Sequence, residues 1–214
     1  MSPTIDELSL QFAIWTHTSE GLALDVGCGD GIATAAALER GGRVVAIDPD
    51  SGALERLRAR VPTEQHGRLR LIVTDLRDLE FMQGGLSAVH AAYVLHLLGP
   101  DEIESCFAKF FRWLYPNGRL FISTLTPMGE CWRPFRAELA RRVAAGAPWP
   151  GYIKDVSRFT RRGRDDGVSV NLLDERSLRR LLMAAGFSID AVSAYRVPWD
   201  SEQMCCAVTA RCGR

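Results

Sequence analysis

The residues with the clearest chemical potential lie in one short stretch, residues 22–31, with the sequence LALDVGCGDG. Its apolar run contains Asp25, whose carboxylate can accept hydrogen bonds from hydroxyl or ammonium groups. Three glycines follow at alternate positions, Gly27, Gly29 and Gly31. Glycine adopts positive φ angles and lets backbone approach a ligand closely. Helix-forming residues 32–38 come next, so the stretch predicts a strand, a tight turn and a helix that bind a nucleotide-like ligand.

The spacing of the glycines distinguishes two kinds of such ligand. A dinucleotide fingerprint has the pattern G-x-G-x-x-G, whereas this loop has G-x-G-x-G, with Ile32 where the third fingerprint glycine would fall. An ordinary glycine-rich turn without a ligand is the plain alternative. The stretch resembles motif I of the class I S-adenosylmethionine-dependent methyltransferases. The resemblance implies S-adenosylmethionine as cofactor, S-adenosylhomocysteine as its product, and a cradle for the methionine part formed by Asp25, Gly27, Cys28, Gly29 and Gly31.

Two further strand ends carry acidic residues. Residues 43–48 form a continuous apolar run that ends at Asp48, where a carboxylate can bind both hydroxyls of a ribose. Pro49 follows it and is expected to line the same site, although Asp48 could instead cap the next helix. Residues 68–73 form a third strand. After this strand the resemblance implies an adenine contact through Asp75 and Leu76, with helix capping as the alternative for Asp75.

A fourth strand, residues 86–92, ends beside the best candidates for chemistry. The carboxyl end of this strand faces the cofactor in such an architecture, so Ala92 is expected to contact the cofactor. Tyr93 could touch the substrate or the sulfonium, and His96 could be a general base because imidazole titrates near neutral pH. The alternative for His96 is a packing role. Ser87 stands where the resembled family commonly has an aspartate, a departure that concerns a structural contact more than the cofactor site.

Length and composition limit the class of protein. The chain has 214 residues, 47% hydrophobic and 24% charged, which suits one globular domain over residues 1–214. Its 26 basic and 26 acidic residues give no net charge, so we expect no nucleic-acid partner. We find no apolar run of transmembrane length and no signal-peptide pattern, and we expect a cytoplasmic protein. The six cysteines form no C-x-x-C pair and lack zinc-ligand spacing, so we expect reduced, buried thiols and no metal. The sequence assigns no oligomeric state.

The resemblance also implies a fold. Further helices are expected at residues 51–61 and from Pro100, a fifth strand at 114–124, and a helix ending at Gly186. Two last strands follow, from Phe187 and over 204–210. We therefore expect an α/β, Rossmann-like fold: a seven-stranded, mostly parallel sheet whose last strand is antiparallel, with helices on both faces and a helical lid insertion.

Two segments are candidates for covering the site. Residues 1–20 predict a helix from near Pro3 with an apolar face that includes Phe12 and Trp15, and in the resembled family such a helix often covers cofactor and substrate. Residues 126–170 form a long connection with a helix near 135–145, the kind of insertion that often caps a substrate. Candidate substrate-binding residues are Trp15, Trp132, Trp149, Tyr152 and Arg161. For the arginines, a solvated charge run is an equal alternative.

The preferred function is transfer of a methyl group from S-adenosylmethionine to an oxygen or nitrogen of a small molecule. Ala92-Tyr93-Val94-Leu95 replaces the Asn/Asp-Pro-Pro-Tyr signature associated with amino groups of DNA bases or glutamine. A protein or RNA acceptor remains an alternative, as does a cofactor-binding subunit without catalysis. A nucleotide-dependent oxidoreductase is a rival from another class, disfavoured by the missing third glycine.

Overall fold

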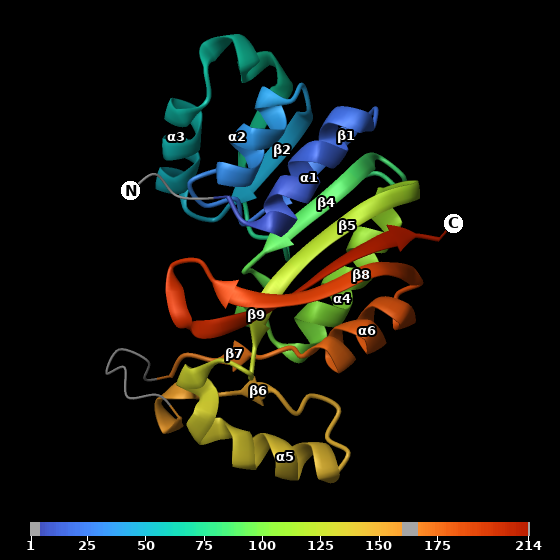
Figure 1. Ribbon diagram of the computed structural model, residues 1–214. Helices are drawn as coiled ribbons and strands as arrows, with labels where there is room; N and C mark the ends of the chain where they lie inside the picture. The colour runs from blue at the N-terminus through green and yellow to red at the C-terminus, as the bar shows by residue number, and fades with distance from the viewer. Residues whose placement is uncertain (1–4, 160–166, 214) are drawn as a thin grey trace.

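The computed structural model describes residues 5–159 and 167–213 of the chain. A seven-stranded sheet forms its centre, in the order β3-β2-β1-β4-β5-β9-β8 (Figure 1). The strands are β1 (Leu22–Val26), β2 (Arg43–Asp48), β3 (Leu69–Val73), β4 (Leu86–Ala92), β5 (Leu114–Thr126), β8 (Phe187–Val197) and β9 (Asp200–Cys212). The first five pair in parallel, and β9 lies antiparallel between β5 and β8. The predicted sheet, with its antiparallel last strand, is confirmed.

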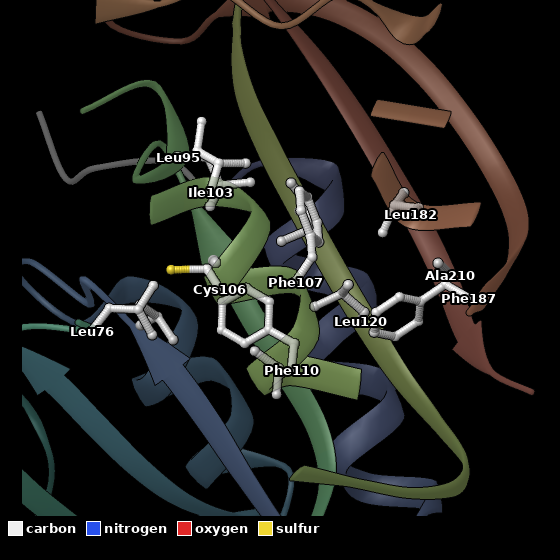
Figure 2. Packing of buried hydrophobic residues seen from close by; sticks show 14 of the residues in the cluster. Leu76, Leu95, Ile103, Cys106, Phe107, Phe110, Leu120, Leu182, Phe187 and Ala210 are labelled. Atoms are coloured by element: carbon white, nitrogen blue, oxygen red, sulfur yellow. The ribbon is translucent and has the colours of Figure 1, made fainter. Parts of the chain in front are cut away.

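Helices cover both faces of this sheet. They are α1 (Glu7–Thr18), α2 (Ile32–Glu39), α3 (Ser51–Arg60), α4 (Pro100–Trp113) and α6 (Glu175–Ala184), whereas α5 (Arg136–Ala144) lies in the insertion after β5. On one face, α4 and α6 bury the largest apolar cluster, where Phe107 and Phe110 of α4 lie near Leu120 of β5 (Figure 2). On the other face, α1, α2 and α3 pack over small side chains of β1 and β2. Alternate residues of each strand serve the two faces, as expected for a sheet buried on both sides.

The N-terminal helix begins later than the sequence suggests. The side chain of Asp6 accepts a hydrogen bond from the Ser9 N–H at 2.9 Å, which makes Asp6 the N-cap of a helix that starts at Glu7. The expected start near Pro3 falls on residues outside the described part. This helix packs against strands β4 and β5 of the sheet (Figure 1).

The insertion after β5 folds as a small lobe. It contains η3 (Glu130–Phe135), α5, η4 (Val156–Arg158) and a two-stranded ladder of β6 (Tyr152–Ile153) with β7 (Val170–Asn171). Its apolar residues, among them Trp132 and Phe135, form a third cluster that continues onto Leu125 and Cys205 of the main sheet. The neighbouring Cys206 belongs to the cluster under α4, so the adjacent cysteines face opposite sides as predicted. All six cysteines are free thiols, but the expected burial holds for four of them, because Cys28 and Cys131 are only half-buried. In the described part of the chain, no helix is both long and apolar enough to cross a membrane.

Gly31 provides a stability test of the tight turn. Its φ is +73°, and a Cβ added there would collide with the side chain of Leu57 on α3. We expect Gly31→Ala to lower the free energy of unfolding by about 3 kcal/mol, from backbone strain plus overpacking. Gly146 is the matched control, because its φ is +71° and an added Cβ would meet no atom within 4 Å. Gly146→Ala should cost only about 1 kcal/mol in the same urea titration. Equal losses in the two variants would contradict the packing argument.

Candidate functional site

Two cavities lie where the parallel strands of the sheet end. The first, of about 250 Å³, is walled by the start of α1, the glycine loop after β1, the end of β4 and Trp199; we call it the loop cavity. The second, of about 370 Å³, is walled by the ends of β2 and β3 and by Tyr93, Val94, Leu97 and Leu98; we call it the strand-end cavity. Gly27 and Tyr93 line both. Ligand sites of open α/β sheets occur at this edge.

The glycine loop takes the backbone conformation that its sequence predicts. Gly27, Gly29 and Gly31 have φ angles of +61°, +51° and +73°. A Cβ on Gly27 would lie 2.5 Å from Cγ2 of Val94, so that glycine is required by close packing. A Cβ on Gly29 would meet nothing within 4 Å, so this part of the loop faces open space. The Cys28 N–H donates to the Ile47 carbonyl at 3.0 Å and ties the loop to β2. Burial, with help from nearby carboxylates, raises the pKa of the Cys28 thiol, which is therefore neutral.

Asp25 lies in the wall of the loop cavity and is only 1% exposed. Its Oδ2 accepts a hydrogen bond from Thr34 Oγ1 at 2.6 Å, and its Oδ1 lies 2.7 Å from Nδ1 of His90. Sequence reasoning missed His90. The signal that could have found it is the register of two neighbouring strands, because Asp25 of β1 pairs directly with His90 of β4.

Asp48 joins the glycine loop to the strand-end cavity. Its Oδ2 accepts the Gly29 N–H at 3.0 Å, and its Oδ1 accepts the Asp50 N–H at 2.9 Å. Each carboxylate oxygen has two lone pairs, so both oxygens retain acceptor capacity. Pro49 lines the same cavity. Helix α3 is capped by the side chain of Asp50, which accepts from Gly52 N–H, so Asp48 is not needed for that purpose.

Asp75 also lines the strand-end cavity, but its carboxylate is already held by Arg77. Nε and Nη2 of Arg77 each donate to Asp75 at 2.8 Å, and these hydrogen bonds lower the pKa of Asp75. The Arg77 backbone N–H donates to the same carboxylate, but residues 76–78 form a turn and not a helix, so Asp75 does not have the helix-capping role that was its alternative. Leu76 is 4% exposed, lines the cavity and belongs to the main apolar cluster.

Tyr93 stands at the junction of the two cavities in a strained conformation. Its φ is +58°, which is uncommon for a residue with a side chain. Its N–H donates to the Ser123 carbonyl at 2.8 Å, and its ring contacts the Trp199 ring edge-to-face at 4.6 Å between centroids. Burial, followed by the hydrogen bond to the Tyr195 hydroxyl, raises the pKa of Tyr93, so the phenol is neutral. Its neighbour Ala92 lines the loop cavity.

His96 lies in η2 (Leu95–Leu97), and its side chain lines neither cavity. Burial lowers the pKa of its imidazole to about 4, so the ring is neutral at pH 7. Its Nδ1 is buried without a hydrogen-bond partner among residues 5–159 and 167–213. The same described residues contain no group of three or more histidine, cysteine, aspartate or glutamate side chains placed to hold a metal ion.

Comparisons with known proteins agree with this geometry. Residues 23–118, which span β1 to the start of β5, match the family model described as a methyltransferase domain. Over these residues the chain is similar to the methyltransferase domain family, in agreement with the resemblance of its glycine loop to the class I S-adenosylmethionine-dependent methyltransferases. The cofactor of this family is S-adenosylmethionine, with S-adenosylhomocysteine as its product.

Individual relatives are more distant. The chain is 30% identical over 171 residues to the trans-aconitate 2-methyltransferase of Methylobacterium radiotolerans. The aligned residues cover 79% of this chain and 58% of that protein. It is 32% identical over 95 residues to an uncharacterized methyltransferase of Synechocystis sp., covering 44% of this chain and 42% of the relative. The chain thus spans about half the length of these curated relatives.

Among solved structures, the Burkholderia thailandensis 1,6-didemethyltoxoflavin-N1-methyltransferase, with bound 1,6-didemethyltoxoflavin and S-adenosylhomocysteine, is similar with a TM-score of 0.69 at 21% identity. That likeness covers 96% of this chain and 78% of the Burkholderia chain, and it shows the fold.

The predicted substrate residues do not gather at the cavities. Trp15 donates from Nε1 to the Ser87 carbonyl at the start of β4, 3.4 Å away, and its ring lies 4.9 Å from the Arg119 guanidinium. The expected place of Trp15 beside the substrate is therefore wrong, because Trp15 lies where β4 begins and the cavities lie where the parallel strands end. The start of α1 lines the loop cavity instead, through Ile5, Asp6 and Ser9.

The aromatic residues of the insertion have other surroundings. Trp132 is 6% exposed in the apolar cluster of the insertion lobe, a cluster against which Tyr93 also packs. The Arg180 guanidinium lies over the Trp149 ring, 5.3 Å from its centroid, and the Tyr152 carbonyl accepts a hydrogen bond from Arg142 at 2.6 Å. None of these three side chains lines either cavity. Arg161 lies outside the described residues.

Trp199 is the aromatic residue that sequence reasoning missed. It is 69% exposed in the turn between β8 and β9 and lines the loop cavity. In Figure 1 this turn lies on the same side of the molecule as the ends of β2 and β4. Its sequence signal is a tryptophan in the short segment between two predicted strands.

Proposed function

We propose that the protein transfers a methyl group from S-adenosylmethionine to a small-molecule acceptor. The observation that carries this proposal is the pair of cavities that meet at Gly27 and Tyr93, one against the glycine loop and one beside Asp48 and Asp75. A ligand with an amino-acid end and a nucleoside end matches two adjacent compartments of this kind.

The residues present fit such a ligand. Gly29 leaves open space where any side chain would project, so the loop backbone can approach the amino-acid end. Asp48 retains acceptor capacity on both oxygens for the two ribose hydroxyls. Leu76 offers an apolar wall beside Asp75 for a base. Because Arg77 occupies much of the Asp75 carboxylate, we assign the recognition of an exocyclic amine to the acceptor capacity that Asp75 retains.

The cofactor would supply an electrophilic methyl group on a sulfonium centre. The protein would position the acceptor in line with that methyl group and exclude water, since methyl transfer needs few dedicated side chains. Tyr93 is suited to this task because its backbone is fixed by Ser123 and its ring borders both cavities. Its raised pKa suits a hydrogen-bond donor better than a base.

The acceptor would enter at the loop cavity, between Tyr93, Trp199 and the start of α1. Aromatic walls favour a planar or apolar acceptor. The described wall holds three carboxylates, those of Asp6, Asp25 and Asp30, beside the imidazole of His90. We therefore infer an uncharged or cationic acceptor that is methylated on nitrogen or oxygen. We further propose that the insertion over residues 126–170 caps this acceptor indirectly, through the apolar cluster that Tyr93 joins.

Calorimetric titration with S-adenosylhomocysteine tests the cofactor assignment. We expect saturable binding in the micromolar range typical of enzyme ligands, and no binding of a nicotinamide dinucleotide. Transfer of tritiated methyl from S-adenosylmethionine to a panel of amines, heterocycles, phenols and carboxylates then tests the acceptor class. Preference for trans-aconitate over all neutral or cationic compounds would contradict the charge argument. Failure to bind S-adenosylhomocysteine at millimolar concentration would refute the function itself.

The same panel separates the alternatives. A chain that binds S-adenosylhomocysteine but methylates only a protein or RNA fraction would support a macromolecular acceptor. Cofactor binding without any methyl transfer would support a regulatory subunit.

A further inference from the structure

A chain of buried polar side chains crosses the wall of the loop cavity. It runs from Asp25 on β1 to His90 on β4, then to Ser9 on α1, and ends at Asp6, the N-cap of that helix. Nδ1 of His90 lies 2.7 Å from Asp25 Oδ1, Nε2 of His90 lies 3.2 Å from Ser9 Oγ, and Ser9 Oγ lies 3.0 Å from Asp6 Oδ2. Asp25, His90 and Ser9 are 1%, 3% and 5% exposed. Buried polar groups at such distances are paired donor to acceptor.

Counting hydrogens gives the direction of each bond. The Asp25 carboxylate can only accept, so Nδ1 of His90 carries a hydrogen. The Asp6 carboxylate can only accept, so the single hydroxyl hydrogen of Ser9 is directed to Asp6. Ser9 Oγ then meets Nε2 of His90 with its lone pairs, and that contact is a hydrogen bond only if Nε2 also carries a hydrogen. All three contacts are satisfied together when His90 is an imidazolium.

The surroundings of His90 suit a positive charge. The Phe12 ring of α1 stacks on the imidazole with 4.8 Å between centroids and 20° between planes, an arrangement that favours a cation. Two carboxylates terminate the chain, Asp25 from β1 and Asp6 from α1, and Asp30 lines the same cavity. The other side chains at this point are neutral: Thr34 of α2, which holds the second oxygen of Asp25, and Phe121 of β5, which pairs with His90 in register.

We propose that His90 is a positioning residue, doubly protonated, that fixes the Asp25 carboxylate at the loop cavity and fastens the start of α1 to the same point. This proposal rests on the proposed function in one respect, namely that Asp25 meets the amino-acid end of the cofactor. Holding Oδ1 and Oδ2 from the interior, through His90 and Thr34, leaves the remaining lone pairs of Asp25 for a ligand. Docking of α1 and the orientation of Asp25 are thereby coupled through one ring.

The same count excludes a nucleophilic serine. Ser9, His90 and Asp25 are the residue types of a catalytic triad, in which a neutral histidine takes the serine proton. Here the Ser9 proton is directed to Asp6, and Nε2 of His90 is itself a donor, so Ser9 is not activated.

Nuclear magnetic resonance of the ligand-free protein tests the protonation state. At neutral pH we expect two His90 ring N–H resonances protected from exchange with water. A neutral ring would give one. A single ring N–H overturns the proposal.

Two substitutions of the same residue test the positioning role. The side-chain nitrogen of Asn matches Nδ1 of histidine, so His90→Asn keeps a donor to Asp25 and loses the hydrogen bond to Ser9 Oγ. The nitrogen of Gln matches Nε2, so His90→Gln keeps Ser9 and loses the donor to Asp25. We expect His90→Gln to weaken S-adenosylhomocysteine binding at least about tenfold, since hydrogen bonds to charged groups are strong. We expect His90→Asn to retain binding within about threefold.

Hydrogen exchange in α1 supplies the second readout. Ser9→Ala and His90→Asn both cut the link to α1, and each should speed exchange of the α1 amides about tenfold without matching the binding loss of His90→Gln. His66→Gln is the control, because His66 lies in η1 (Thr63–Arg68), where its Nε2 contacts the Val61 carbonyl at 2.9 Å. Equal binding losses in His90→Asn and His90→Gln would indicate a merely structural histidine and overturn the proposal.

These experiments separate two kinds of failure. If the wild-type protein does not bind S-adenosylhomocysteine, the proposed function fails. The number of His90 ring N–H resonances and the amide exchange of Ser9→Ala still test whether Asp25, His90, Ser9 and Asp6 are linked as proposed. If a His90 variant does not fold, the ring N–H resonances of the wild type and the amide exchange of Ser9→Ala still test the protonation of His90 and its link to α1.

Discussion

Asp48→Ala is expected to weaken S-adenosylhomocysteine binding about 100-fold while the protein stays folded. The carboxylate would accept from two ribose hydroxyls, and each hydrogen bond to a charged acceptor contributes roughly 1.5 kcal/mol or more. The substitution also frees the Gly29 N–H that Asp48 holds at 3.0 Å, which loosens the loop that cradles the amino-acid end. Both effects act on the same ligand. Isothermal titration of the variant, with circular dichroism to verify folding, measures the loss.

Asp50→Ala is the matched control for this experiment. Asp50 caps α3 and contacts Arg56, but it lines neither cavity. Its removal should lower stability by about 1 kcal/mol and change binding less than about twofold. If both variants lost affinity equally, the ribose assignment of Asp48 would be wrong, and the effect would belong to the start of α3.

The parts of the site that sequence predicts are those built from neighbouring residues. Positive φ angles at Gly27, Gly29 and Gly31 follow from alternating glycines in a loop that must turn tightly between a strand and a helix. An apolar run that ends in a carboxylate predicts a buried parallel strand with Asp48 at its open end. The parallel order and the antiparallel last strand follow from the succession of such units and from the resemblance that motif I carries.

The parts that sequence misses depend on register and on distance along an element. His90 meets Asp25 because β4 pairs with β1 in one register, and a shift of one residue would turn His90 to the other face. Trp15 follows the N-cap Asp6 by nine positions, and at about 1.5 Å per residue it lies roughly 13 Å further along α1. That distance carries it from the cavity to the opposite edge of the sheet. Trp199 reaches the loop cavity only because the long strands β8 and β9 bring their turn there.

The insertion shows the same limit in another form. Its aromatic residues were expected to form a substrate pocket because a long connection inside a compact domain often has a function. In the structure, Trp132 and Phe135 are buried in the apolar cluster of the insertion lobe. The lobe needs this cluster because it lies outside the main sheet. Composition identifies such residues as apolar but does not say whether they serve a ligand or a local core.

Acidification is expected to destabilise the protein through His96. In the folded protein, burial lowers the pKa of this imidazole to about 4, whereas the unfolded chain takes up the proton near the usual value of about 6.5. Between these two values the unfolded state binds one more proton than the folded state, so stability falls as the pH falls. From pH 7 to pH 5 the wild type should lose about 2 kcal/mol through this residue. The loss would be complete below the folded pKa.

His96→Gln removes the titrating group and should lose that much less stability over the same interval. For a chain of this size the difference between the two proteins corresponds to about 4–8 °C in melting temperature at pH 5, after normalising each to its own value at pH 7. His17→Gln, at the exposed end of α1, removes a histidine without touching η2 and serves as the control. Melting curves that shift in parallel for wild type and His96→Gln would show that burial of His96 does not govern the acid response.

The same variant decides whether His96 is the general base. The His96 side chain lines neither cavity, and η2, in which it lies, contacts β5 and β7. A buried imidazole with a pKa of about 4 has little driving force to remove a proton at pH 7. We therefore expect His96→Gln to keep methyl transfer within about threefold once its acceptor is known, because the methyl group needs only positioning. A drop of about 100-fold or more with an unchanged acid response would reverse this assignment. His96 would then reach the acceptor in a conformation other than the one described, and Tyr93 alone would not account for the chemistry.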